Sequence, residues 1–225
     1  RAESEPEQAY TVNRDSAGRL AGAVAAYAGR LLHVSTDFVF DGRQAKPYTE
    51  TDIPHPLGVY GRSKLEGEQA VLAALPAAVV VRTAWVYGVQ GHNFVKTMLK
   101  VAAQGKPLRV VDDQTGSPTW AADIAGALIA LVDRDAQGMF HFTSAGSTTW
   151  HGFATAILHE AAPLGFDVQT GTVEPIPTSA YSTAAVRPAY SVLDTRKIQP
   201  WLSAPIPPWR TSLITMLKEL RSCAE

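Results

Sequence analysis

A regular alternation of short apolar runs with longer helical patterns constrains the fold more than any other feature of this chain. Four apolar runs predict strands, at residues 30–35, 77–82, 107–111 and 138–143. Between and around them, helical periodicity predicts helices at residues 14–29, 63–75, 93–104, 119–132, 150–162 and 210–220. Strands that alternate with helices of this length indicate βαβ units and a mostly parallel sheet. The fold class is therefore α/β.

Composition excludes several classes of protein. With 46% hydrophobic and 18% charged residues, the chain can bury a core and is not disordered. Its 20 basic and 21 acidic residues leave no positive excess, so nucleic acid is not expected as a main partner. No apolar run reaches the length of a membrane span. Its single cysteine, Cys223, is typical of a reducing compartment and predicts a cytoplasmic protein, and the histidines show no metal-ligand spacing.

Small polar residues follow directly after the first predicted strand. Ser35, Thr36 and Asp37 stand where that strand ends, and ligands bind at the carboxyl ends of the strands in parallel sheets. Serine and threonine are also ordinary turn-forming residues at such positions, and this simpler interpretation stays open.

The stretch "GVYGRSKLEGE" places Tyr60 and Lys64 four residues apart at the start of a predicted helix, one turn apart on the same face. A phenol with an ordinary pKa of about 10 is a poor acid at neutral pH. A lysine ammonium one turn away and the positive end of the helix stabilise phenolate and lower that pKa. The spacing alone is common, but the upstream hydroxyls of Ser35 and Thr36 favour a proton-transfer site that holds a substrate oxygen beside the phenol.

The order of motifs along nearly the whole chain resembles the extended short-chain dehydrogenases, and among them the dTDP-4-dehydrorhamnose reductase family. The matching stretches are "STDFVFDG", "PYTETD", "PLGVYGRSKLEGE", "VVVRTAWVYG", "NFVKTML", "DDQTGSPTW" and "RPAYSVLDTRK". The resemblance implies that Tyr60 is the catalytic acid and that Lys64 lowers its pKa and binds the nicotinamide ribose. It implies that Thr36 orients the substrate, and that Ser35 and Thr83 contact the cofactor.

The same resemblance implies a sugar pocket lined by Asp37, Phe38 and Trp85. The family usually has tyrosine where this chain has Phe38, so one hydroxyl contact with the sugar is in doubt. Related sugar-nucleotide dehydratases carry glutamate at that position, and its replacement by Phe38 argues against a dehydration.

The nucleotide of the substrate is expected across the C-terminal half. Asn93 opens a predicted helix, whose free N–H groups can meet a diphosphate, and Arg187 can form a forked contact with a phosphate. A helix cap for Asn93 and a surface ion pair for Arg187 are the competing interpretations. Ser117 and Thr119 are weaker candidates, because a turn and a helix N-cap explain them.

No glycine-rich phosphate-binding turn follows any predicted strand. The family has such a turn in an N-terminal segment of roughly 65 to 70 residues that this sequence does not match. We therefore expect a truncated Rossmann-like sheet with helices on both faces. Residues 1–110 would form the end of the cofactor-binding domain with the catalytic residues, and residues 111–225 a smaller, mainly substrate-binding region.

What the resemblance implies for function is reduction of the 4-keto group of dTDP-4-dehydro-6-deoxy-L-mannose by NADPH or NADH, with a nucleotide sugar as the small-molecule partner. It also implies a homodimer with Mg²⁺ at its interface. We expect the 225-residue chain alone to be inactive and to expose an unpaired edge at the strand 30–35. Two alternatives remain: another nucleotide-sugar epimerase or reductase, or a non-catalytic relative such as the regulatory subunit of methionine adenosyltransferase.

Overall fold

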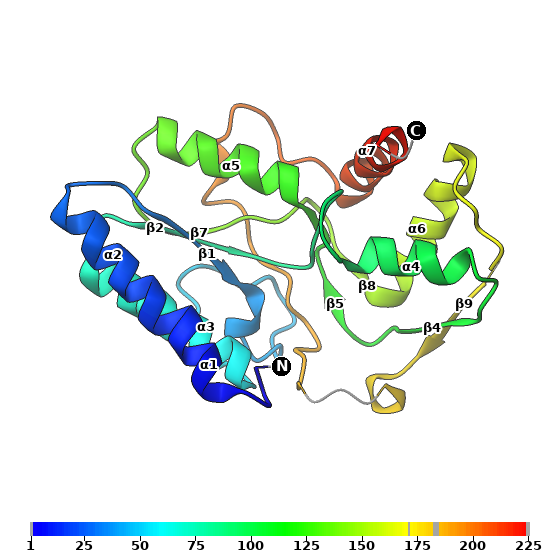
Figure 1. The fold of residues 1–225 in the computed structure, drawn as a ribbon, viewed down its shortest axis with the longest axis horizontal. Helices are drawn as coiled ribbons and strands as arrows, with labels where there is room; N and C mark the ends of the chain where they lie inside the picture. Colours follow the sequence, from blue (N-terminus) through cyan, green and yellow to red (C-terminus); the bar gives the residue numbers. More distant parts are fainter. Residues whose placement is uncertain (1, 171, 182–184, 224–225) are drawn as a thin grey trace. The chain divides into compact units, whose positions relative to one another are not determined.

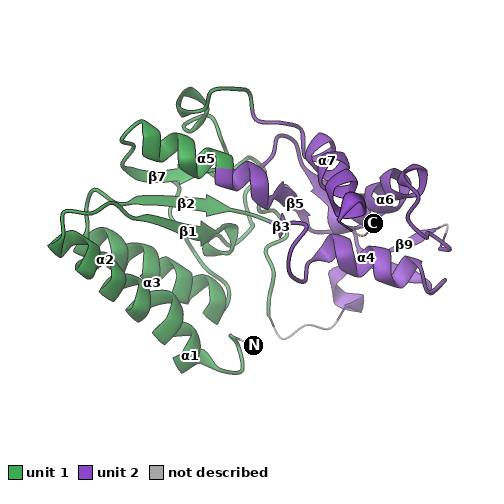
Figure 2. Ribbon diagram, turned by 45° about the horizontal axis from the view of Figure 1, so that its top comes forward, with its two compact units in different colours: residues 1–84, 126–142, 183–205 green, residues 85–125, 143–182, 206–225 purple. Residues whose placement is uncertain are grey.

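The computed structural model describes residues 2–170, 172–181 and 185–223, which form two compact units (Figures 1 and 2). The first unit comprises residues 1–84, 126–142 and 183–205, and the second comprises residues 85–125, 143–182 and 206–225. Each unit is therefore assembled from separate segments of the chain. The division of roles at residue 110 stays a prediction.

The first unit is built on a parallel sheet in the order β1-β2-β7, formed by β1 (Leu32–Thr36), β2 (Val79–Thr83) and β7 (Gly138–His141). All five residues of β2 are buried, as expected for a central strand in a parallel sheet. The three strands coincide with three of the predicted apolar runs, and the predicted parallel arrangement is confirmed.

Helices cover both faces of this sheet (Figure 2). On one face lie α1 (Pro6–Tyr10), a π-helical turn (Thr11–Asp15), α2 (Ser16–Ala26) and α3 (Val59–Ala74). The end of α5 (Ala121–Asp133) lies on the other face. Ala21 of α2, Val71 of α3 and Val80 of β2 are fully buried together. The chain leaves α3 just before Pro76, where a proline disfavours a further helical turn.

The π-helical turn, which leads directly into α2, packs closely against α3. A Cβ atom at Gly67 would collide with the backbone carbonyl oxygen of Asn13 in that turn. The Asn13 amide also donates a hydrogen bond of 2.9 Å to the Ser63 hydroxyl on α3. Glycine at position 67 therefore allows α3 to pack this close to the π-helical turn.

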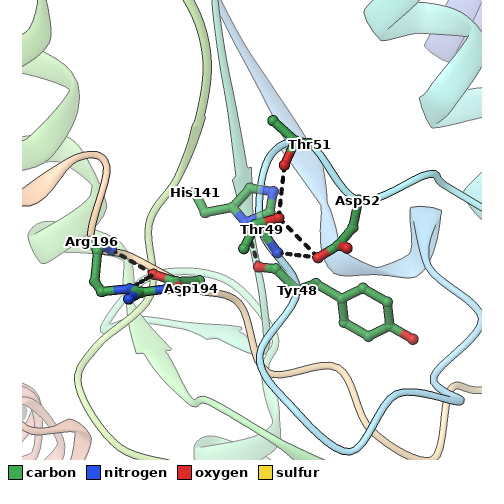
Figure 3. A network of polar contacts seen from close by, with 7 residues as sticks. All are labelled: Tyr48, Thr49, Thr51, Asp52, His141, Asp194 and Arg196. Carbon is green, nitrogen blue, oxygen red and sulfur yellow. Dashed lines mark hydrogen bonds and ion pairs between the residues drawn. The ribbon is translucent and has the colours of Figure 1, made fainter.

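Side chains close the β7 edge of the sheet. A Glu50 carboxylate oxygen accepts a hydrogen bond from the His141 backbone N–H, and the Lys197 ammonium donates one to the Met139 carbonyl oxygen. The buried His141 ring contacts the Tyr48 carbonyl oxygen at 3.0 Å (Figure 3). Burial and the nearby Arg82 lower the pKa of His141 to about 3, so the ring is neutral.

A short turn fixes the loop that supplies these groups (Figure 3). The Asp52 carboxylate accepts hydrogen bonds from the Thr49 backbone N–H at 2.6 Å and from its hydroxyl at 2.9 Å. Tyr48 forms an isolated parallel bridge with Leu193. The β1 edge differs, because no further strand pairs with it among the described residues, and Val34 on it is 41% exposed. The expected unpaired edge is present.

The second unit combines helices with three two-stranded pairs, β3-β6, β4-β9 and β5-β8. Its strands are β3 (Val86–Tyr87), β4 (Leu108–Val111), β5 (Thr115–Gly116), β6 (Thr119–Trp120), β8 (Thr148–Thr149) and β9 (Val173–Ile176). Its helices are α4 (Phe94–Ala102), α6 (Trp150–Ala161), α7 (Trp209–Ser222) and the start of α5. Phe153, Ile157 and Met216 lie fully buried in its core.

Thr119 corrects one prediction of the sequence analysis. It was expected to cap the helix that becomes α5, but it lies in β6 and its hydroxyl donates to the Ser117 carbonyl oxygen. In the described part of the chain, single-turn 3-10 helices lie at Asp37–Val39, Ala162–Leu164, Thr178–Ala180 and Gln199–Trp201.

Candidate active site

Thr36 and Asp37 form a tight turn at the carboxyl end of β1. The Thr36 hydroxyl accepts a hydrogen bond from the Phe38 N–H at 3.2 Å and donates one to the Asp37 carboxylate at 3.1 Å. Asp37 is 2% exposed, and burial raises its pKa to about 6 although Ser191 and Thr36 hydrogen bonds lower it. This turn therefore holds a carboxylate that is partly protonated near neutral pH.

Tyr60 lies in the first turn of α3, next to the turn formed by Thr36 and Asp37. Gly58 in an extended conformation precedes the helix, which begins at Val59 rather than at residue 63 as predicted. The Tyr60 ring meets the Phe38 ring edge-on, with centroids 5.7 Å apart. Burial raises the pKa of Tyr60, a hydrogen bond with Thr36 lowers it, and the Asp37 charge raises it. Thr36 therefore lies close to Tyr60, and its role as the hydroxyl that orients the substrate stays a prediction. The pKa of Tyr60 moves upwards, opposite to the expected direction.

Lys64 lies one turn further along α3. Its ammonium donates a hydrogen bond of 2.7 Å to the carbonyl oxygen of Val34 in β1. Burial lowers the pKa of Lys64, and the carboxylate of Glu68 raises it. The ammonium therefore sits at the edge strand of the sheet, on the side of α3 that faces β1.

A cavity of about 260 Å³ opens beside Tyr60, lined among others by Glu3, Phe38 and Arg187. Arg187 thus lies at the same cavity as the proposed acid, where a phosphate contact was expected. A Glu3 carboxylate oxygen accepts hydrogen bonds from the backbone N–H groups of Val59 at 2.8 Å and of Tyr60 at 3.4 Å. No local pattern indicates this long-range cap, because 56 positions separate Glu3 from Val59.

Two of the residues predicted to contact the cofactor, Ser35 and Thr83, have hydroxyl groups that form no hydrogen bond within the described parts of the chain. Their hydroxyl oxygens are buried. Both stand at the carboxyl ends of neighbouring strands, where Thr36 pairs with Thr83 across β1 and β2. Buried hydroxyls without partners are costly, so this strand edge is suited to a polar ligand.

The remaining candidates belong to the second unit. Trp85 has a left-handed backbone, with φ of 48°, and its ring stacks on Trp150 with centroids 3.6 Å apart. Asn93 is the N-cap of α4: its side-chain oxygen accepts from the Lys96 N–H and its amide donates to the Gly88 carbonyl oxygen. The helix-cap interpretation of Asn93 is confirmed.

Ser117 also makes a structural contact, because its hydroxyl donates a hydrogen bond of 2.7 Å to the Gly146 carbonyl oxygen. This contact joins residues 29 positions apart, so it is a long-range structural contact and not the local turn that the simpler interpretation of Ser117 predicted.

Sequence reasoning missed the pair formed by Glu68 and Arg82. Two hydrogen bonds, of 2.9 and 2.6 Å, join the Arg82 guanidinium of β2 to the Glu68 carboxylate of α3. The side chains are 4% and 2% exposed. An arginine inside an otherwise apolar strand was the available signal, since such a charge must be paired when it is buried.

A parallel sheet with hydroxyls at the ends of its strands, and a helix that presents tyrosine and lysine beside them, defines an extended short-chain dehydrogenase. Residues 1–222 match the RmlD substrate binding domain family. The chain therefore belongs to this family.

Similar proteins that carry a name support this family membership. The dTDP-4-dehydrorhamnose reductase of Aggregatibacter actinomycetemcomitans is 42% identical over the whole chain and 77% of its own length. That of Mycobacterium tuberculosis is 46% identical over 96% of the chain and 71% of its own length. Among solved structures, the Bacillus anthracis dTDP-4-dehydrorhamnose reductase in complex with NADP superimposes with a TM-score of 0.91 at 34% identity, over 97% of this chain and 75% of that one.

Proposed function

We propose that this protein reduces the 4-keto group of dTDP-4-dehydro-6-deoxy-L-mannose to give dTDP-L-rhamnose, with NADPH or NADH as the reductant. The cluster of Thr36, Tyr60 and Lys64 at the carboxyl end of β1 carries the proposal, together with the membership of the family and its relatives of that name. When bound, the nicotinamide supplies the hydride. The chain's own residues must then hold the sugar and deliver a proton to its carbonyl oxygen.

Each residue has a role in this scheme. Tyr60 donates the proton, because a phenol is protonated at neutral pH, as a reduction requires. Thr36 orients the carbonyl oxygen beside the phenol, and Lys64 binds the nicotinamide ribose. Asp37, Phe38 and Trp85 are the proposed contacts with the sugar.

Arg187 is the preferred ligand for the diphosphate, because it lines the same cavity as Tyr60 and a guanidinium can form a forked contact with a phosphate. The Asn93 side chain is already bonded at both ends, so its contribution would be to hold the N-terminus of α4 in place.

The chain's hydroxyls suit the nicotinamide end of the cofactor. Ser35 and Thr83 offer buried polar atoms at the strand edge next to Tyr60 and Lys64. We also propose that the pyrophosphate is bound by residues other than these, since no glycine-rich turn occurs in the sequence, and that the isolated chain therefore binds neither cofactor tightly.

The proposal extends to a cytoplasmic homodimer with Mg²⁺ at its interface, as in the resemblance. Throughout the described ranges, no group of three or more His, Cys, Asp or Glu side chains could hold a metal ion. None of the helices in the described ranges has the length and hydrophobicity that crossing a bilayer demands.

Two alternatives are weaker. An epimerase or another sugar-nucleotide reductase shares the fold, as the UDP-glucose 4-epimerase of Thermotoga maritima does with a TM-score of 0.79 at 19% identity. That likeness concerns the fold alone. A non-catalytic relative has no need of the intact set of Thr36, Tyr60 and Lys64.

The test is NADPH oxidation by the complete protein with dTDP-4-dehydro-6-deoxy-L-mannose. The Tyr60→Phe variant should lose roughly 10²- to 10⁴-fold in rate, which is the usual contribution of a general acid. Tyr27→Phe is the matched control, because Tyr27 is 89% exposed and its variant should retain the full rate. Near-normal turnover by Tyr60→Phe would refute the assignment. Absence of turnover by the unmodified protein, with activity on a different 4-keto sugar, would favour the alternative reductase.

A further inference from the structure

The buried ion pair of Glu68 and Arg82 lies one helical turn from Lys64. Residues four apart on a helix share a face, and the Glu68 charge raises the pKa of Lys64, so the carboxylate acts on the Lys64 ammonium as well as being the partner of Arg82. The two Arg82 hydrogen bonds, of 2.9 and 2.6 Å, engage both carboxylate oxygens at once. The guanidinium carbon also lies over the Phe40 ring, 5.1 Å from its centroid. Arg82 therefore holds Glu68 in a forked, fixed geometry.

The position of Lys64 shows the effect of this arrangement. Its ammonium donates a hydrogen bond of 2.7 Å to the Val34 carbonyl oxygen of β1 and forms no ion pair with the Glu68 carboxylate. Other titratable groups near this part of α3 are His33 on β1, Asp37 after β1 and Tyr60 on the helix. Burial and the Lys64 charge lower the pKa of His33 to about 4, so that ring is neutral and adds no charge.

Stability alone does not account for a buried pair of this kind. Replacing a buried ion pair by apolar residues of similar volume is often neutral or stabilising, whereas removing one partner is strongly destabilising. The pair's proximity to Lys64 offers a second reason for its presence, because a lone carboxylate at position 68 would attract the ammonium at position 64.

We propose that Arg82 is a positioning residue: by engaging both oxygens of Glu68, it keeps that carboxylate from capturing Lys64, and so leaves the ammonium at the β1 edge beside Tyr60. What Lys64 does there rests on the proposed function, but the charge relation among the three residues does not. Arg82 acts through Glu68 and Lys64 and touches neither substrate nor cofactor.

The experiment measures the pKa of Lys64 in the complete protein by NMR of ¹³C-methylated lysines, with the Lys64→Arg variant to assign its signal. Arg82→Met should raise the pKa of Lys64, because the freed carboxylate stabilises the ammonium. Glu68→Gln should lower it, since the carboxylate that raises it is gone. The double variant Glu68→Gln/Arg82→Met should bring the pKa back towards the wild-type value.

Arg14→Met is the matched control. Arg14 pairs with Glu66 on the same helix at 3.0 Å, but those side chains are 41% and 40% exposed, so water can solvate the freed carboxylate. This variant should leave the pKa of Lys64 unchanged.

Catalysis provides the second readout. Arg82→Met should lower kcat/KM by up to roughly 100-fold, as a misplaced catalytic group does, and the double variant should recover part of the loss. An unchanged or lowered pKa of Lys64 in Arg82→Met would overturn the proposal and leave only a structural clamp. If Arg82→Met does not fold, Glu68→Gln decides, and an unchanged pKa of Lys64 there would overturn the proposal equally. A protein with no reductase activity but with these pKa changes would refute the proposed function and retain the charge relation.

Discussion

The contact between Gly67 and the π-helical turn gives a sharp test of how α3 is held. Gly67→Ala places a methyl group against the Asn13 carbonyl oxygen. The obstacle is backbone, so it cannot rotate away as a side chain would, and the two helices must separate. Separation would loosen the fully buried contact of Ala21 with Val71 beneath them.

The expected cost follows from two opposing effects. Replacing a helical glycine by alanine gains about 1 kcal/mol from helix propensity. Overpacking a close contact typically costs about 1–3 kcal/mol and more where backbone must move. We expect a net loss of about 2 kcal/mol in the free energy of unfolding, which in a chain of 225 residues lowers Tm by about 4–8 °C.

Thermal unfolding followed by circular dichroism measures this effect. Gly22→Ala on α2 is the control: nothing lies within 4 Å of its added Cβ, so the propensity gain should raise Tm. The two variants make the same chemical change in neighbouring helices and should move Tm in opposite directions. A Gly67→Ala protein as stable as the wild type would refute the close-packing argument.

Three other perturbations follow from the site. Asp37 has a pKa of about 6 in the folded state against 3.8 in the unfolded chain, so stability should fall by roughly 3 kcal/mol as pH rises from about 4 to above 6. Asp37→Asn should remove that fall, and an unchanged pH dependence of Tm would contradict the assignment. Gly116→Ala would put a methyl group into the Trp85 ring, so it should abolish the circular dichroism of the Trp85–Trp150 stack. A retained signal would count against a fixed stack. Arg187→Ala should raise KM for the sugar nucleotide roughly 10- to 100-fold with little change in kcat. An unchanged KM would end its phosphate role.

Local sequence patterns predicted most of the helices and strands, because apolar runs and helix-ending residues such as proline are recognisable over a few positions. The run "AAVVVR" is apolar because β2 is buried on both faces, and proline at position 76 marks the end of α3. The last helix was expected at residues 210–220 and runs from Trp209 to Ser222. The third predicted strand, at residues 107–111, is present as β4, but it pairs with β9 in the second unit and not with the three-stranded sheet.

What the sequence could not predict depends on contacts between distant segments. The Glu3 carboxylate caps the N-terminus of α3 from a distant part of the chain. The pairing of Glu68 with Arg82 and the π-helical turn likewise form only when the folded chain brings distant segments together. The direction of the Tyr60 pKa was wrong for the same reason: helix spacing indicated a nearby cation, whereas burial has the larger effect. Thr119 was taken for a cap because a short strand before a helix has no distinct local pattern.

The interleaving of the two units bears on the order in which the chain can fold during synthesis. β7 joins the first sheet only after the second unit's residues 85–125 have been made, and the bridge from Tyr48 needs Leu193. Until then, one edge of β2 and its buried side chains have no covering strand. A chain that ends at residue 145 should therefore be digested by a protease at the loop near Tyr48, and the 225-residue chain should resist. During synthesis, the sheet of the first unit therefore stays incomplete until β7 and Leu193 have been made. Binding by a chaperone would be needed most in that period.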